Sequence, residues 1–263
     1  MNGIDYLFAA MLGGRTLAAP VDLAAPVDVA PPSAAGLSCP DDMKLVVGLH
    51  HEIVERMCLR FDGQQCWRFL PGITAFEGRQ TPISTCMDEY EWPNQKGAKP
   101  PVMMRFVEAQ KSCEGVGKRL CSEFEWELAC EGPETFPYPY GFAHEKAACV
   151  NEKPYRPYSQ AKLSSESATV REKETERLYQ AEPSGSRPQC VSPSGVVDLV
   201  GNVEEWVTTS RPEWAYPSSL KGGYWSKPWS GCRGTNDSHG PLFRFYDIGF
   251  RCCTDARAEQ ASP

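Results

Sequence analysis

Twelve cysteines, spread between residues 39 and 253, constrain this chain of 263 residues more than any other feature. An even number of scattered cysteines is typical of disulfide frameworks, which form and persist in oxidising compartments. A metal site built from Cys and His would need clustered ligands, yet the sequence contains no C-x-x-C motif and its four histidines are scattered. We therefore expect a disulfide-stapled protein that is periplasmic, secreted or held at the cell surface.

Composition and charge narrow the class of protein further. The 22 glycines and 23 prolines indicate many turns and loops, and a chain of this length can still bury a substantial core. The formal net charge is −7, whereas nucleic-acid binders normally carry the opposite sign. No stretch approaches the ~18 consecutive apolar residues of a membrane helix. We expect neither a nucleic-acid partner nor a membrane span.

The chain divides into a short leader, one domain and a tail. Residues 6–14 are apolar, and Ala-Pro-Val-Asp then occurs at 19–22 and again at 25–28, which is typical of a linker. As an export signal this start has its charges reversed, with Asp5 before the apolar run and Arg15 after it. A degenerate signal and a plain linker both remain open. We expect the domain to span 39–255, with a polar insertion near 153–182, after an N-terminal segment of 1–38 and before a tail of 256–263.

Local patterns predict two helices and some short strands. One helix is expected over 105–116. A second begins at Ser122, whose hydroxyl can form a capping box with Glu125, and runs to Cys130 with Trp126 facing a core. Residues 43–47 look like a strand, and the insertion is expected to be a solvated loop with one exposed helix.

Three ordered sequence blocks go beyond these generic features. They are residues 101–141, which include GKRL, SEFEWE and YPYG; residues 195–206, GVVDLVGNVEEW; and residues 221–252, which begin KGGYW and end GFRC. In order and spacing they resemble the formylglycine-generating enzyme family, also called sulfatase-modifying factors, over roughly 39–255. The resemblance implies an α+β, irregular, loop-rich fold with a C-type-lectin-like core.

The same resemblance provides a test for catalysis. Enzymatic members oxidise a sulfatase cysteine to formylglycine with copper held by two thiolates soon after the Gly-Gly of the third block, and soft Cu(I) prefers such ligands. Here the position of the first catalytic cysteine falls near Lys227, and Cys232 matches a third, structural cysteine. We therefore do not expect copper.

The resemblance also implies two disulfides, Cys113 with Cys252 and Cys130 with Cys232. The other eight cysteines have no family template, so their pairing stays open. Proximity and position favour four guesses, which are Cys39–Cys86, Cys58–Cys66, Cys121–Cys253 and Cys149–Cys190.

A calcium site is a further implication of the resemblance. Family members use the Asn and Glu of the second block, with backbone carbonyls, and oxygen ligands suit this hard cation. The matching residues are Asn202, Val203 and Glu205, although Glu204 replaces the usual aromatic residue. The alternative is that Asn202 caps a turn and Glu205 pairs with an arginine. Asn151 is a candidate for a second calcium site.

Aromatic and basic residues in or beside the third block are candidates for a ligand groove, although most of the aromatic ones are expected in the core. A groove that binds a peptide or glycan through stacking and charge would use Trp225, Lys227, Trp229, Arg233, His239 and Arg244. The adjacent Asp237, Ser238 and His239 do not suggest a hydrolase, because neighbours in sequence rarely form a triad and G-x-S-x-G is missing.

Two functions of different classes follow from these residues. The favoured one is a non-catalytic binding or accessory module that recognises a protein, peptide or glycan. The alternative is an oxidoreductase that forms formylglycine, or performs a related oxidation, with another metal or a relocated thiol pair such as Cys252-Cys253. The missing copper cysteine favours the binding module.

Overall fold

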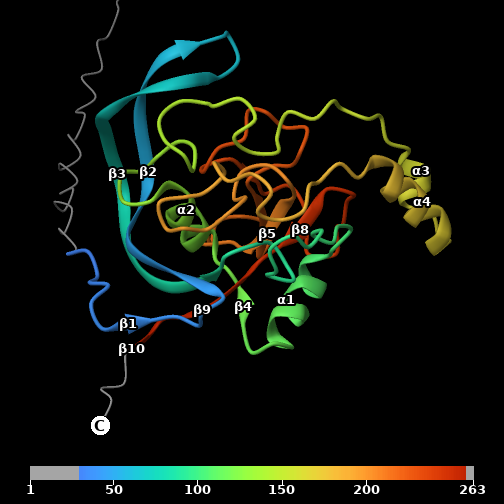
Figure 1. The fold of residues 1–263 in the computed structure, drawn as a ribbon, viewed down its shortest axis with the longest axis horizontal. Coiled ribbons are helices and arrows are strands. Elements are labelled where there is room, and N and C mark those ends of the chain that lie inside the picture. Colours follow the sequence, from blue (N-terminus) through green and yellow to red (C-terminus); the bar gives the residue numbers. More distant parts are fainter. Residues whose placement is uncertain (1–29, 259–263) are drawn as a thin grey trace, which may run out of the picture.

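The computed structural model describes residues 30–258. Its elements form two four-stranded sheets, in the orders β2-β3-β9-β4 and β7-β6-β5-β8, and a two-stranded sheet of β1 and β10. Loops connect most of these elements, as Figure 1 shows, so the expected irregular α+β architecture is confirmed. In chain order the elements are β1 (Leu37–Ser38), β2 (Met43–Phe61), β3 (Cys66–Asp88), α1 (Phe106–Glu114), β4 (Arg119–Leu120), α2 (Glu123–Glu131), α3 (Gln160–Leu163), α4 (Ala168–Leu178), β5 (Glu204–Thr208), β6 (Ser218–Lys221), β7 (Thr235–Asn236), β8 (Ile248–Phe250), β9 (Cys252–Asp255) and β10 (Arg257–Ala258).

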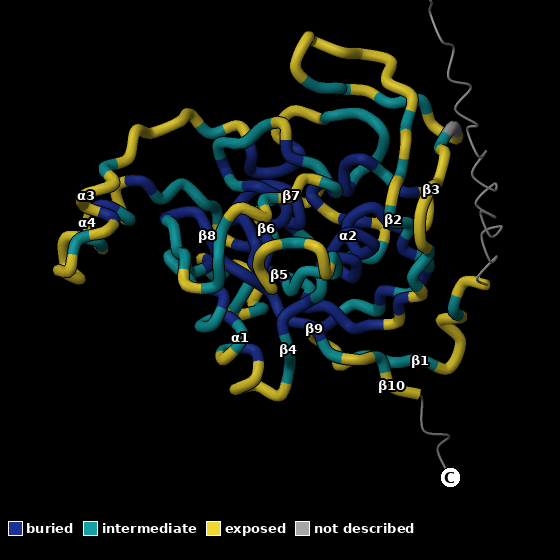
Figure 2. The backbone as a smooth tube through the Cα atoms, turned by 180° about the vertical axis from the view of Figure 1, so that it is seen from behind, coloured by how far each residue is buried: buried dark blue, intermediate teal, exposed yellow. Residues whose placement is uncertain are grey.

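The long antiparallel hairpin of β2 and β3 curves around one side of the molecule (Figure 1). Buried and less buried residues alternate along the first half of β2. Val46 and His50 point inward and are buried, as expected for a strand with one covered face. Helix α2 packs against this half. The far half of the hairpin is mostly exposed, as is the α3–α4 region at the opposite end of the molecule (Figure 2).

The sheet of β5, β6, β7 and β8 forms the centre of the domain. Strand β5 pairs in parallel with β8, with Glu204 opposite Ile248, and antiparallel with β6. Trp206 is fully buried and packs with Phe106 of α1 and Phe250 of β8. The backbone N–H of Glu204 donates to the carbonyl of Asp247 at 2.9 Å. This pairing places two acidic residues, far apart in sequence, at the same end of neighbouring strands.

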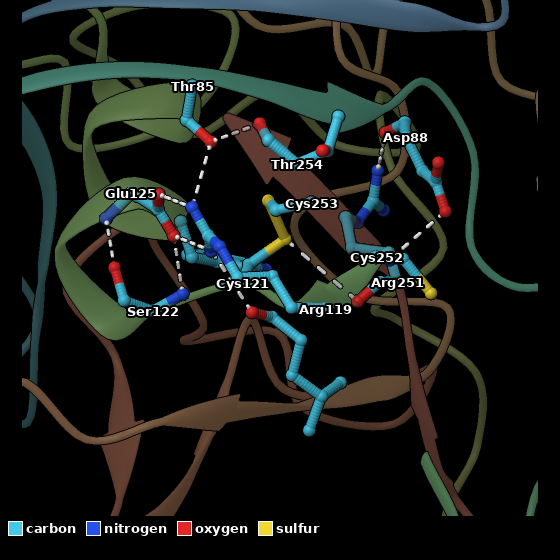
Figure 3. The surroundings of a disulfide bond; sticks show 12 residues. Thr85, Asp88, Arg119, Cys121, Ser122, Glu125, Arg251, Cys252, Cys253 and Thr254 are labelled. Atoms are coloured by element: carbon cyan, nitrogen blue, oxygen red, sulfur yellow. Dashed lines mark hydrogen bonds and ion pairs between the residues drawn. A yellow bond between two sulfur atoms is a disulfide. The ribbon is translucent and has the colours of Figure 1, made fainter. Parts of the chain in front are cut away.

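Both expected helices are present. Helix α1 covers 106–114 of the expected 105–116, and α2 begins after Ser122 with the expected capping box. The Glu125 N–H donates to the Ser122 hydroxyl, the Ser122 N–H donates to the Glu125 carboxylate, and Arg119 also binds this carboxylate (Figure 3). Trp126 is buried as expected. The cap therefore fixes the entry of α2 beside the disulfide between Cys121 and Cys253.

Six disulfides use all twelve cysteines. They include the two bonds that the family resemblance implied and the four that were guessed from proximity. Cys113 of α1 and Cys121 are bonded to the adjacent Cys252 and Cys253 of β9, and Cys130 of α2 is bonded to Cys232. The full set is Cys39–Cys86, Cys58–Cys66, Cys113–Cys252, Cys121–Cys253, Cys130–Cys232 and Cys149–Cys190.

Two regions differ from the sequence-based description. The polar insertion contains two helices, α3 and α4, rather than one, because Leu163 and Leu178 are buried in a cluster with Trp225 and Tyr246. Residues 37–38 and 257–258, expected in the linker and the tail, pair as β1 and β10. The rest of the expected leader, 1–29, and of the tail, 259–263, lies outside the described residues. No helix within 30–258 combines the length and apolar character needed to cross a membrane.

Candidate functional site

The strip from Gly222 to Cys232 forms a tight turn over the central sheet. Gly222 and Gly223 have positive φ, and a Cβ on Gly223 would lie 1.9 Å from the Ser230 hydroxyl oxygen, so only glycine fits there. This turn brings the Lys227 ammonium to 3.0 Å from a carboxylate oxygen of Glu204 on β5. Lys227, near which the first copper cysteine of the family was expected to fall, is therefore one half of an ion pair.

A cavity of about 500 Å³ opens beside this ion pair. Half of its fourteen lining residues are Phe, Tyr or Trp, and two carboxyl groups, an ammonium, an imidazole and two side-chain amides also line it. We call it the aromatic groove. Its lining residues are Tyr155, Tyr158, Gln160, Glu204, Tyr224, Lys227, Trp229, Asn236, His239, Phe243, Phe245, Tyr246, Asp247 and Ile248.

Trp229 is the most exposed aromatic residue of the groove, together with Tyr155, each with 59% of its surface accessible. Besides the groove it lines two further cavities, of about 680 Å³ and 240 Å³. Tyr155 and Tyr224 also line the larger of these. A large exposed indole at the junction of three cavities is a typical contact residue for a ligand.

The acidic groups of the groove differ in their surroundings. Glu204 is paired with Lys227, whereas no ion pair among the described residues includes Asp247. Asp247 is only 3% exposed, and burial, with Glu204 nearby, raises the pKa of its carboxyl well above the ordinary value. Burial also lowers the pKa of His239, which keeps this imidazole neutral near pH 7. The groove of the free protein is thus lined by aromatic rings, one ion pair and a buried carboxyl group with a raised pKa.

The six residues proposed for a groove do not all lie together. Lys227, Trp229 and His239 line the aromatic groove. Trp225 instead lies in the core with 1% exposure, because its ring packs against Tyr179 and Tyr246. The remaining two lie elsewhere. Arg233 binds Glu131 and lines the smallest of the three cavities, and Arg244 lines a separate cavity of about 270 Å³ beside α4.

Of the groove residues that were not proposed from the sequence, four bear on its chemistry. Tyr155 and Tyr158 precede α3 in the insertion, for which no family pattern was available, and Tyr158 packs edge-on against Phe245. Each directly follows a proline, and this repeated Pro-Tyr pair was the only local signal. Glu204 was noticed as a substitution for an aromatic residue, but its pairing with Lys227 was not foreseen. Asp247 directly follows the aromatic run 243–246.

The sulfur atoms that copper would require are all in disulfides. Cys232, the one cysteine of the strip, is bonded to Cys130 of α2. The alternative thiol pair, Cys252 and Cys253, is bonded to Cys113 and Cys121. Two-coordinate Cu(I) needs two thiolates, so the residues of this strip do not fit copper.

The proposed calcium ligands have other partners. Both carboxylate oxygens of Glu205 accept hydrogen bonds of 2.7 Å from the guanidinium of Arg251, and one of them also accepts from the Trp126 indole. The Asn202 side-chain oxygen accepts from the N–H of Glu182 at 2.9 Å. A guanidinium already occupies the cation position beside Glu205, so these residues fit calcium poorly.

The burial of Arg251 explains why it pairs with Glu205. Arg251 is 1% exposed, and burying its charge requires the Glu205 carboxylate as a partner. The alternative considered for Glu205, an arginine partner, is thus the contact that the structure contains. Asn151 differs, because both polar atoms of its buried side chain have no hydrogen-bond partner among the described residues. No group of three or more His, Cys, Asp or Glu within residues 30–258 could hold a metal ion.

Comparisons with known proteins agree with this architecture. The family description of the sulfatase-modifying factor enzyme 1-like domain matches residues 73–256. Among solved structures, CarF is similar with a TM-score of 0.50 and 13% identity, covering 82% of this chain and 98% of CarF. PvdO from Pseudomonas aeruginosa is similar with a TM-score of 0.48 and 18% identity, covering 79% of this chain and 93% of PvdO. No curated protein matched the chain. At these identities the structural likeness concerns the fold alone.

Proposed function

We propose that this chain, which belongs to the family of sulfatase-modifying factor enzyme 1-like domains, is an exported binding or accessory module. Its aromatic groove recognises a protein, peptide or glycan, and it carries out no copper-dependent oxidation. The proposal rests on this chain's own groove, since members of one fold differ in function.

The ion pair of Lys227 and Glu204 is the observation that carries the non-catalytic half of the proposal. An ammonium in the place of a thiolate cannot ligate Cu(I) and repels it. Glu204 replaces the family's usual aromatic residue, and the two exchanges compensate each other because the new charges neutralise one another. Six disulfides leave no thiol pair for a relocated copper site.

The groove itself supports the binding half. A cavity of about 500 Å³ lined by aromatic rings and a few polar groups has the size and composition of a typical ligand site. Trp229 and Tyr155 expose large apolar surfaces at its mouth. The six disulfides are typical of an oxidising compartment, which supports export to the periplasm, the cell surface or the medium.

A pull-down from the native compartment tests the groove. We expect the wild-type protein to capture a partner that Trp229→Ala captures at least about tenfold less well, because exposed tryptophans at binding sites often contribute 2 kcal/mol or more. Phe61→Ala is the matched control, since Phe61 is 65% exposed at the far end of the β2–β3 hairpin. Undiminished capture by Trp229→Ala, or loss only in Phe61→Ala, would contradict recognition through the groove.

A further inference from the structure

Asp247 occupies an unusual place in the groove. It is almost fully buried, it lines the cavity, and it is not part of any ion pair among the described residues. A buried carboxyl group normally has a charged partner or remains protonated. The cavity beside Asp247 is the space from which a partner could come.

The groups that face Asp247 do not provide that partner. Glu204 lies on the neighbouring strand and repels a second negative charge. Lys227 attracts Asp247, but its ammonium is bound to Glu204 at 3.0 Å. Tyr224 and Tyr246 contribute phenol groups, and burial raises the pKa of Tyr224 to about 12, so these rings stay neutral. With both acids ionised, the groove carries one negative charge more than its lysine balances.

The walls of the cavity suit a cation. Tyr155, Tyr158, Tyr224, Trp229 and Tyr246 border the space beside the two acids. The faces of such rings attract ammonium and guanidinium groups, and the attraction is strongest where water is excluded. A neutral sugar could stack on the same rings, but it would provide no counter-ion for the carboxylate of Asp247.

We propose that the aromatic groove binds a basic side chain, lysine or arginine, of a peptide or protein partner, with Asp247 as its counter-ion. This inference rests on the proposed binding function and names the chemistry that the groove recognises. Binding of the cation displaces the proton of Asp247 to solvent, so charge and protons balance. The Lys227–Glu204 pair stays intact and forms the polar edge of the site.

The proposal predicts a particular pH dependence. In the free protein burial raises the pKa of Asp247 and favours its protonated form, whereas the complex contains the carboxylate. Affinity for a basic peptide should therefore increase as pH rises, by about tenfold per pH unit, until the pH reaches that raised pKa. His239 also lines the groove, but its lowered pKa confines its own titration to acidic pH.

Three pentapeptides of the form Gly-Gly-X-Gly-Gly, with lysine, arginine or norleucine at X, test the proposal by calorimetry. We expect the lysine and arginine peptides to bind the wild-type protein at least about tenfold more tightly than the norleucine peptide at pH 8. Asp247→Asn should lose this preference and the pH dependence. Asp237→Asn removes an exposed acid of the same segment and should retain both, and His239→Gln should retain the dependence above pH 7.

Several outcomes would overturn the proposal. These are equal binding of the lysine and norleucine peptides, no binding of either basic peptide, binding of a neutral disaccharide alone, or an unchanged pH dependence in Asp247→Asn. If Asp247→Asn does not fold, the peptide preference and pH dependence of the wild-type protein decide the matter. The Trp229→Ala pull-down judges groove binding separately, so the cation preference can fail while the proposed function stands.

Discussion

The Cys130–Cys232 disulfide should stabilise the domain far more than the Cys58–Cys66 disulfide. The first bond joins α2 to the end of the strip that forms the groove, and its cysteines are 102 residues apart. The second closes the far end of the β2–β3 hairpin, and its cysteines are 8 residues apart. Replacing both members of each pair by alanine gives two variants that differ mainly in the length of chain released.

Chain entropy sets the expected magnitudes. With the Cys121–Cys253 bond still in place, the Cys130–Cys232 bond closes a loop of about 32 residues, formed by 121–130 and 232–253. Releasing such a loop costs about 3.7 kcal/mol of unfolding free energy, and releasing one of about nine residues costs about 2.6 kcal/mol. Cys130 and Cys232 are also fully buried, so their replacement removes packed atoms as well. We therefore expect the Cys130→Ala, Cys232→Ala double variant to be less stable than the Cys58→Ala, Cys66→Ala double variant by about 2 kcal/mol or more.

Urea denaturation, followed by tryptophan fluorescence, measures both losses under the same conditions. The m-value should stay close to that of the wild-type protein in the hairpin variant, because the surface exposed on unfolding hardly changes. Equal losses in the two variants, or a larger loss in the hairpin variant, would refute the argument from loop length.

Three further predictions concern the buried acids near Arg251. Burial raises the pKa of Glu91 to about 8 from an ordinary 4.5, so the unfolding free energy of the wild-type protein should fall as pH rises across this range. Glu91→Gln can keep the contacts to Ser184 and Asn202, and its stability relative to wild type should increase from pH 5 to pH 8. A stability difference that stays constant with pH in urea titrations would contradict this. Glu205→Gln should cost about 3 kcal/mol or more, because it leaves the Arg251 guanidinium buried without its counter-ion. Calcium should change the melting temperature of wild type and Glu205→Gln equally, and a calcium shift lost only in the variant would restore Glu205 as a ligand.

Sequence patterns predicted the scaffold well because its determinants are local or recur at fixed spacing. The capping box of Ser122 and Glu125 needs only four consecutive residues, so the start of α2 could be located. The order of the three motif blocks identified the family and, through it, the bonds Cys113–Cys252 and Cys130–Cys232.

The chemistry of the groove was harder to predict because it depends on contacts across the chain. Lys227 and Glu204 are 23 residues apart, and neither shows from sequence that the other is its partner. Tyr158 reaches the groove only because the insertion folds back to place it against Phe245. The second helix of the insertion has few apolar residues, so its polar sequence resembled a solvated loop although Leu178 is buried.

The most direct test of the account is a copper assay on the oxidised wild-type protein. It is incubated with Cu(I), oxygen and a sulfatase-derived peptide that contains the target cysteine, and the peptide is analysed by mass spectrometry. With Lys227 paired to Glu204 and all twelve cysteines in disulfides, we predict that the protein does not convert the peptide cysteine to formylglycine. Copper-dependent formylglycine formation by the wild-type protein, above the level without protein, would contradict the central claim.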